Sequence, residues 1–350
     1  MERGTSWFLP AYTWGHDVRE KPPPHTLQQG EGEDTTVSKI ITFTHNNRTF
    51  LLIPLHSPLL QRGWSGRESL FYITMKTGLV LEGGGMRGLF TAGILDVMME
   101  RDIKVDGVVG VSAGACFGCN YVSHQIGRAL RYNLNMKDDP RYMGIRSLIR
   151  SGNLMDAEFA YHTLPDEIDP FDKKTFAQSS VEYHVVCTDV ISGEAVYKRL
   201  TAPVDYEFME WIRASSALPL VSHPVELDGR LLLDGGMTDS IPLKYFQKLG
   251  FKHNIVILTQ PLGFTKKRTK LIPLFRAFMK KYHAVIEVMN RRHIMYNAQL
   301  EYLTQEEQAG RITIIAPDDT LPIGRTQQSG KRMKIVYQMG REAAMKAFSL

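Results

Sequence analysis

Two glycine-rich turns on consecutive strand-to-helix corners constrain this 350-residue chain more than any other feature. The first turn, Gly-Gly-Gly-Met-Arg-Gly at residues 83–88, follows the apolar run 79–81 and opens a helical pattern. The second turn, Gly-Val-Ser-Ala-Gly at residues 110–114, also follows an apolar run and opens a helix. Repeated strand–turn–helix units predict a parallel sheet whose carboxyl ends lie at one edge. We therefore expect a glycine loop with bare N–H groups beside a serine on a sharp turn.

Alternation of apolar strands with amphipathic helices continues from residue 78 to about residue 260. This pattern predicts a three-layer α/β/α fold with a mainly parallel central sheet, followed by a helical C-terminal extension. The predicted strands are 79–82, 105–111, 183–189, 231–233 and 254–259, and the predicted helices are 89–100, 113–120 and 206–215. Beyond residue 260 the apolar spacing predicts one long helix through 275–289, a strand over 311–316 and a closing helix over 329–348.

Ser112 lies at the centre of the second turn. In a G-x-S-x-G turn, Gly110 and Gly114 leave room for a strained corner that lifts the serine hydroxyl clear of the sheet. The adjoining helix N-terminus favours a developing alkoxide. The serine is thus a candidate nucleophile, and the alternative is a capping serine in a tight strand-to-helix turn.

The first turn can present consecutive N–H groups to an oxyanion, with Gly84 and Gly85 as the expected donors. The same residues also satisfy G-x-G-x-x-G, which is typical of dinucleotide-binding sites. That reading requires an acidic residue at the end of the second strand, where this chain has Val111 and Ser112. Arg87 is either a solvated residue at a helix start or an anchor for a substrate phosphate or for the loop itself.

A serine nucleophile needs a base, and Asp234 is the candidate. It follows the apolar run 231–233, and Gly235 and Gly236 behind it would allow its carboxylate to approach another turn closely. An aspartate with the ordinary pKa of about 3.9 is a weak base, so desolvation or tight positioning would have to strengthen it. Without the other two motifs, Asp234 would be interpreted as part of an Asx-type turn that closes a strand.

The three motifs together resemble the patatin-like phospholipases of the bacterial type, over about residues 78–245, and Ala-Ser-Ser-Ala-Leu-Pro at 214–219 looks like a fourth family element. The resemblance implies a lipid acyl hydrolase, of phospholipase A or lysophospholipase type, with Ser112 as nucleophile and Asp234 as base. Its oxyanion loop would be Gly83, Gly84, Gly85, Met86, Arg87 and Gly88. No cofactor is expected, and no cluster of metal ligands is visible. Residues 75–260 would form the catalytic domain and 261–350 a helical region with one added strand.

Two alternatives to the Ser-Asp dyad remain at this stage. His223 or His253 would complete a Ser-Asp-His triad of a carboxylesterase, or the chain would be a lipid-binding module without turnover. Cys116 and Cys119 form C-x-x-C on a helix, where buried packing is favoured over a redox or zinc role.

The remaining expectations concern partners and location. A net charge of +5 from 42 basic and 37 acidic residues is too small for a nucleic-acid binder, but the basic stretch 266–292 is suited to peripheral membrane contact. Three cysteines and no apolar leader or span predict a cytoplasmic protein. Residues 1–74 are expected to be disordered or dispensable, with Met75 as a natural start, except for a hairpin over 40–43 and 50–55. Residues 138–178 are expected to form a lid.

Overall fold

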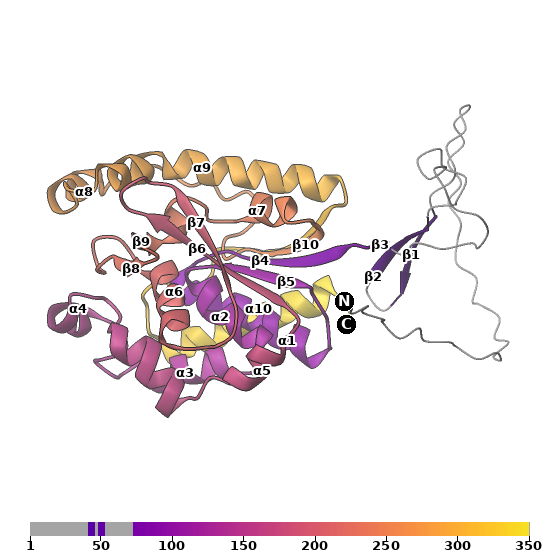
Figure 1. Cartoon of the computed structure of the whole chain (residues 1–350), viewed down its shortest axis with the longest axis horizontal. Coiled ribbons are helices and arrows are strands. Elements are labelled where there is room, and N and C mark those ends of the chain that lie inside the picture. Colours follow the sequence, from indigo (N-terminus) through magenta and orange to yellow (C-terminus); the bar gives the residue numbers. More distant parts are fainter. Residues whose placement is uncertain (1–40, 46–47, 53–72, 350) are drawn as a thin grey trace, which may run out of the picture.

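An eight-stranded mixed sheet forms the centre of the molecule in the computed structural model, which describes residues 41–45, 48–52 and 73–349 (Figure 1). The strand order is β11-β10-β4-β5-β6-β9-β8, with β7 paired to β6. The pairings from β11 to β6 are parallel, whereas β7, β8 and β9 join antiparallel. The strands are β4 (Lys76–Leu81), β5 (Gly107–Val111), β6 (Glu182–Asp189), β7 (Ala195–Leu200), β8 (Val225–Leu227), β9 (Arg230–Asp234), β10 (Phe251–Ile257) and β11 (Ile312–Ile315).

Helices cover both faces of this sheet (Figure 1). Successive side chains of a strand point to opposite faces, so Leu79 and Leu81 belong to one core while Val80 belongs to the other. The first core also contains α1 (Leu89–Glu100), α2 (Ala113–Val122), α6 (Tyr206–Ser216) and α10 (Gly330–Ala347), and the second contains α7 (Leu243–Lys248) and much of α9 (His283–Gln308). The predicted three-layer fold with a mainly parallel sheet and a helical C-terminal region is confirmed.

Four helical segments connect α2 to β6. They are α3 (Arg128–Met136), α4 (Ile145–Ser151), the π-helix η3 (Phe159–Ile168) and α5 (Lys173–Gln178). The expected lid over 138–178 contains the last three of these segments, and its role as a lid stays a prediction. Its helices pack partly on the first core, through Phe159, Leu164 and Phe176.

The prediction of one long helix through 275–289 is wrong. Two helices occupy this region, α8 (Ile272–Phe278) and α9, and Met279 and Tyr282 between them leave the helical conformation. Met279 and the first turns of α9 nevertheless pack into the same core as Phe275. Because the apolar positions on both sides of the break serve one core, the helical spacing in the sequence continued across it.

The segment after residue 260 packs directly on the rest of the chain. β11 extends the central sheet beside β10, and α10 lies against α1 at van der Waals distance. A Cβ atom added to Gly93 would lie 2.1 Å from the Tyr337 carbonyl oxygen, and one added to Gly340 would lie 2.0 Å from that of Phe90. The division of the chain at residue 260 stays a prediction.

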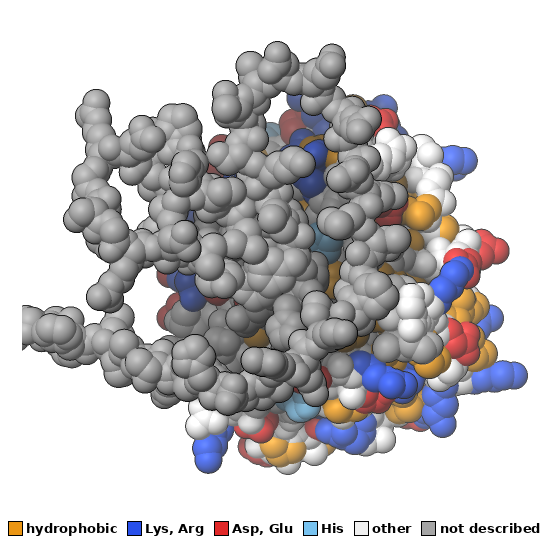
Figure 2. Space-filling model, turned by 90° about the vertical axis from the view of Figure 1, so that its right-hand side faces the viewer, with side chains coloured by type: hydrophobic (Ala, Val, Ile, Leu, Met, Phe, Trp, Pro, Cys, Tyr) orange, Lys and Arg blue, Asp and Glu red, His pale blue; other side chains and the backbone are white. Residues whose placement is uncertain are grey.

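Part of the N-terminal segment forms a small antiparallel sheet. The predicted hairpin is present as β1 (Ile41–His45) paired with β2 (Arg48–Leu52), and β3 (Ile73–Thr74) pairs with β2. The expected disorder over the remainder of 1–74 lies outside the described residues. Only one residue separates β3 from β4, so the carboxyl ends of the parallel strands point away from this hairpin. On the hairpin side, the described acidic and basic side chains at the rim are interspersed (Figure 2).

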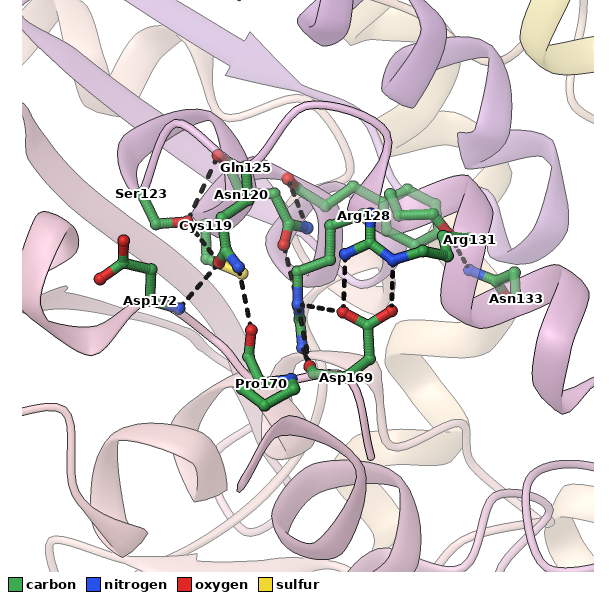
Figure 3. A network of polar contacts seen from close by, with 12 residues as sticks. Cys119, Asn120, Ser123, Gln125, Arg128, Arg131, Asn133, Asp169, Pro170 and Asp172 are labelled. Carbon is green, nitrogen blue, oxygen red and sulfur yellow. Dashed lines mark hydrogen bonds and ion pairs between the residues drawn. The ribbon is translucent and has the colours of Figure 1, made fainter. Parts of the chain in front are cut away.

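A buried ion-pair network joins α2 and α3 to the loop before α5 (Figure 3). The buried Arg128 donates from Nε and Nη2 to the Asp169 carbonyl at 3.1 and 2.6 Å, and from Nη1 to Asn120 Oδ1 at 2.9 Å. Arg131 binds the Asp169 carboxylate with two hydrogen bonds of 2.8 Å. Arg128 also lies over the ring of Phe171, 5.5 Å from the ring centroid, and Phe171 lines the cavity described below.

We expect Asp169→Asn to lower the free energy of unfolding by about 3 kcal/mol, because it removes the carboxylate that neutralises a buried guanidinium. The matched control is Asp166→Asn, since Asp166 pairs with Lys173 at the surface. An exposed pair contributes less than about 1 kcal/mol. Urea denaturation of both variants measures the difference, and equal losses would contradict a structural role for the network.

Candidate active site

A cavity of about 730 Å³ brings together most of the residues that the motifs predicted. It is lined by residues 83–87 of the glycine loop, by Ser112, by Asp234 and by Gly236. The loops after the adjacent parallel strands β4 and β5 supply the glycine loop and Ser112, and Asp234 ends the antiparallel strand β9, where it pairs with Cys187 of β6. Gly88, Gly110, Gly114 and Gly235 do not line the cavity. They lie beneath it, where a side chain would collide with neighbouring atoms.

Ser112 occupies the sharp turn that the sequence predicted. Its φ of 56° and ψ of −123° lie in a strained region of the backbone map, directly before the first turn of α2. Gly114 allows this turn to sit against β4, because a Cβ there would lie 2.5 Å from the Leu81 carbonyl oxygen. The Ser112 N–H donates to Ser215 Oγ at 3.1 Å, and Ser215 Oγ donates to the Val186 carbonyl at 2.7 Å. Ser215 therefore holds the strained backbone of the candidate nucleophile to β6.

The glycine loop presents unpaired amides to the cavity. Within residues 73–349, the N–H groups of Gly83, Gly84 and Gly85 have no hydrogen-bond acceptor. The Met86 N–H, in contrast, donates to the Arg325 carbonyl at 2.8 Å, and the Arg87 N–H donates to the Gly84 carbonyl at 3.3 Å. The geometry leaves the first three amides of the loop available to an anion.

Glu82, which the sequence analysis did not single out, supports the loop from below. The buried carboxylate accepts from the Thr259 N–H at 2.6 Å and from the Tyr296 hydroxyl at 2.7 Å. Thr259 Oγ1 also lies 3.0 Å from the Gly83 carbonyl oxygen, to which it donates. The position of Glu82 at the carboxyl end of an apolar strand was a sequence signal for a residue near the site. Its hydrogen-bond partners, however, lie 177 and 214 positions away along the chain.

Asp234 faces Ser112 from the end of β9. Its side chain is buried, and Oδ1 accepts from the Gly236 N–H at 2.7 Å. Burial raises the pKa of the Asp234 carboxyl, while the Ser112 hydroxyl and the nearby Arg292 charge oppose part of that rise. A carboxylate with a raised pKa is a stronger base than an exposed aspartate.

Four lysine and arginine residues after position 260 line the cavity, namely Lys266, Lys267, Arg292 and Arg325. The first three belong to the basic stretch 266–292 that was noted in the sequence, whereas Arg325 was not singled out there. The Arg292 side chain is half-buried, and its Nε donates to the Gly236 carbonyl at 2.5 Å. Helical spacing placed it on the polar face of α9, and only the packing of α9 over the sheet turned that position toward the site.

The histidines of the alternative triad do not reach the site. Neither His223 nor His253 lines the cavity, and His253 pairs with Thr77 at the amino end of β4. His293 on α9 does line it, and its buried Nδ1 has no hydrogen-bond partner within residues 73–349.

The two cysteines of the C-x-x-C pattern pack as the sequence analysis favoured. Cys119 is buried and donates to the Cys116 carbonyl, and Cys116 contacts Ser216 Oγ at 3.2 Å. Burial raises the pKa of Cys116 to about 11 and that of Cys119 to about 12, so both stay protonated thiols. They are inert under neutral conditions.

Comparisons with known proteins identify the class to which this fold and site belong. Residues 79–246 match the family described as "Patatin-like phospholipase", and they form a patatin-like phospholipase domain. Residues 282–349 match a second family, described only as a domain of unknown function (DUF6363). The first match ends close to β10, whereas Arg292 and Arg325 belong to the second.

Individual relatives resemble only part of the chain. An uncharacterized protein, YjjU, of Escherichia coli K12 is 31% identical over 53% of this chain and 52% of its own length. Lysophospholipase NTE1 of Chaetomium globosum is 28% identical over 49% of this chain and 11% of its own length. This chain thus spans about half the length, or less, of these relatives. The structure of VipD from Legionella pneumophila aligns over 90% of this chain and 72% of its own, with a TM-score of 0.42 and 13% identity.

We expect Ser215→Ala to slow labelling of Ser112 by a fluorophosphonate at least about tenfold and to lower the free energy of unfolding by about 1–3 kcal/mol. The substitution leaves the Ser112 N–H and the Val186 carbonyl without their buried partner. Ser216→Ala is the matched control, because Ser216 Oγ donates to a carbonyl within its own helix at 2.7 Å. Mass spectrometry measures the labelling rates of both variants. Equal slowing in both would contradict the role of Ser215 in holding the Ser112 backbone.

Proposed function

We propose that this protein is a lipid acyl hydrolase that cleaves carboxylic esters of phospholipids or lysophospholipids through an acyl-enzyme. The observation that carries the proposal is the convergence of Ser112, the buried Asp234 and three unpaired loop amides on one cavity. The patatin-like phospholipase domain and the relatives named lysophospholipase support the same class of reaction. Neither His223 nor His253 of the alternative triad lines the cavity.

In the first half of the reaction, Ser112 Oγ attacks the ester carbonyl carbon and its proton passes to the Asp234 carboxylate. The carbonyl oxygen becomes the oxyanion, and the N–H groups of Gly83, Gly84 and Gly85 are positioned to donate to it. Collapse of the tetrahedral intermediate breaks the ester bond. The alcohol leaves with the proton from Asp234, and the acyl group stays on Ser112.

In the second half, Asp234 removes a proton from water, whose oxygen attacks the acyl carbon of the acyl-enzyme. The tetrahedral intermediate then collapses, the bond from Ser112 Oγ to the acyl group breaks, the proton on Asp234 passes to Ser112 Oγ, and the fatty acid leaves. The cavity suits the acyl chain because much of its wall is apolar. The apolar lining includes Phe117, Tyr132, Leu164, Phe171, Ile212 and Phe275. Such a wall can bury the chain of a lipid while the few polar groups orient the ester.

We expect Ser112→Ala to abolish fluorophosphonate labelling and ester hydrolysis, and Asp234→Asn to lower kcat/KM by about 10⁴-fold or more while the fold is kept. The wild-type rate should fall as pH drops through the pKa of Asp234, since the deprotonated carboxylate is the base. That pKa is raised by burial, so the acid limb of the profile should lie above the ordinary value of about 3.9.

The same measurements separate the alternatives. Labelling of well-folded protein that persists in Asp234→Asn at the wild-type rate would refute the dyad. A loss in His293→Ala as large as that in Ser112→Ala would favour a histidine-containing triad. Vesicle binding without release of fatty acid would favour a lipid-binding module.

We also propose that α4 and α8 attach the enzyme to a membrane at the cavity mouth. Both helices border the cavity, through Met143 and Asn153 beside α4 and through Leu271 and Leu274 at α8. They lie at the end of the molecule opposite the hairpin (Figure 1). Ile145, Ile149 and Phe278 are 74%, 80% and 75% exposed there. Arg146, Arg150, Lys280 and Lys281 lie on or next to the same two helices and suit an anionic lipid surface. Among the described helices, none is long and apolar enough to cross a bilayer.

We expect the double variant Ile149→Ser/Phe278→Ser to weaken binding to anionic phospholipid vesicles at least about tenfold, because two side chains lose their burial in lipid. The control is Leu249→Ser/Ile335→Ser, which removes two exposed apolar side chains from α7 and α10 regions outside the cavity wall. Vesicle sedimentation measures both. Unchanged binding of the first variant would overturn the proposed docking surface, and hydrolysis of a soluble ester should persist in both variants.

A further inference from the structure

Four basic side chains line one part of the cavity that holds Ser112 and Asp234. They are Arg87 of the glycine loop, Lys266 after β10, Arg292 of α9 and Arg325 between β11 and α10. Three of the four come from the segment beyond the patatin-like domain, and two of them from the domain of unknown function. Segments far apart in the sequence therefore converge to place positive charge beside the candidate nucleophile.

These four cations, which we call the cationic wall, lack acidic partners. Within residues 73–349, none of them forms an ion pair with a carboxylate, whereas Arg131, Arg311 and Arg341 elsewhere do. The buried Nε of Arg87 has no hydrogen-bond partner at all among the described residues. Lys266 has its ammonium over the ring of Tyr296, 4.0 Å from the centroid. Donors are thus left free at the cavity surface.

The carboxylates that face the wall do not balance its charge. Glu82 attracts Arg87, Lys266 and Arg292, but its oxygens already accept from Thr259 and Tyr296. Asp234 attracts Arg292, although burial raises the pKa of that carboxyl. Three guanidinium groups and the Lys266 amine, which is about half protonated at neutral pH, outnumber the two carboxylates and leave a net positive charge at the site.

Burial and mutual repulsion both disfavour the charged forms of these side chains. Burial, together with the charges of Arg292 and Arg325, lowers the pKa of Lys266 to about 7. Burial and the Arg325 charge likewise lower the pKa of Arg292 and of Arg87. Half-buried cations crowded in this way are costly unless an anion neutralises them. The arrangement of these four side chains is suited to the binding of an anion.

We propose that the cationic wall binds the phosphate group of the lipid whose ester Ser112 attacks, and that it selects lipids with a phosphomonoester headgroup. This inference rests on the proposed function. A phosphomonoester carries close to two negative charges at neutral pH and several acceptor oxygens, which suit guanidinium and ammonium donors. A phosphocholine headgroup would bring a quaternary ammonium into the same positive field, where repulsion disfavours it. The segment beyond the patatin-like domain thereby sets headgroup preference.

The test compares three substrates with one acyl chain: 1-acylglycerol 3-phosphate, its phosphocholine ester and the monoacylglycerol without phosphate. The variant is Lys266→Gln/Arg325→Gln, because Arg292 also supports the turn after Asp234. The wild type should prefer the phosphomonoester. The variant should lose about 100-fold in kcat/KM for the phosphomonoester and less than about threefold for the monoacylglycerol. Equal losses on all three substrates, or no loss on any, would overturn the proposal.

Lys248→Gln/Lys252→Gln is the matched control. It also removes two positive charges, from exposed residues at α7 and the amino end of β10 that lie outside the cavity wall. Its rates on all three lipids should stay at the wild-type level. A loss as large as that of the wall variant would show that net charge and long-range attraction, instead of a site, cause the preference.

Binding to Ser112→Ala protein separates this proposal from the proposed function. Calorimetry with the phosphomonoester lipid below its micelle concentration should show binding that Lys266→Gln/Arg325→Gln abolishes. Such binding without hydrolysis by the wild type would refute the proposed hydrolase activity and support the phosphate site. Hydrolysis without any dependence on the headgroup would support the hydrolase activity and refute the phosphate site. Inorganic phosphate should bind at least about tenfold more weakly than the lipid. Equal affinity for both would overturn the lipid assignment in favour of free phosphate.

Discussion

The carboxylate of Glu82 joins three parts of the chain beneath the glycine loop. It lies at the end of β4, accepts from the Thr259 N–H after β10 and accepts from the Tyr296 hydroxyl on α9. A buried carboxylate without such donors is costly, so these elements reach their positions together. The course of the glycine loop, which Thr259 also binds at Gly83, depends on this junction. The placement of α9 over the site, and with it the position of Arg292, depends on it as well.

Several features of the candidate active site lower the stability of the folded protein. Ser112 holds a strained backbone. The pKa of Asp234 is raised, so the penalty on its charged form is absent below the unfolded pKa and grows as pH rises above it. The cationic wall adds repulsion between half-buried charges. The two extensive cores on either side of the sheet offset these costs, which is the usual balance between activity and stability.

Local pattern was sufficient for much of the fold and for the candidate catalytic residues. The helix over 89–100 was predicted with its observed bounds, because a glycine turn precedes it and its apolar spacing is regular. Ser112, Asp234 and residues 83–87 were also found from motifs, and they do line one cavity. The antiparallel strands β7 and β8 and the helices of 128–178 were missed, because they are short and lack a strong apolar period. The Asp228-Gly229 turn between β8 and β9 was an overlooked hairpin signal. The break between α8 and α9 was missed because both sides of it serve one core.

The sequence by itself determined the positions that need special backbone geometry. Only small residues fit at the turns around Ser112, the glycine loop and Asp234, so their identity is visible in the chain without knowledge of its neighbours. The tertiary structure alone decided which charged side chains are part of the site. Lys266, Arg292 and Arg325 look like ordinary surface cations in the sequence, because charge has no local pattern that marks burial. Their proximity to Ser112 arises from contacts between segments about 150 to 210 residues apart, which no short-range period encodes.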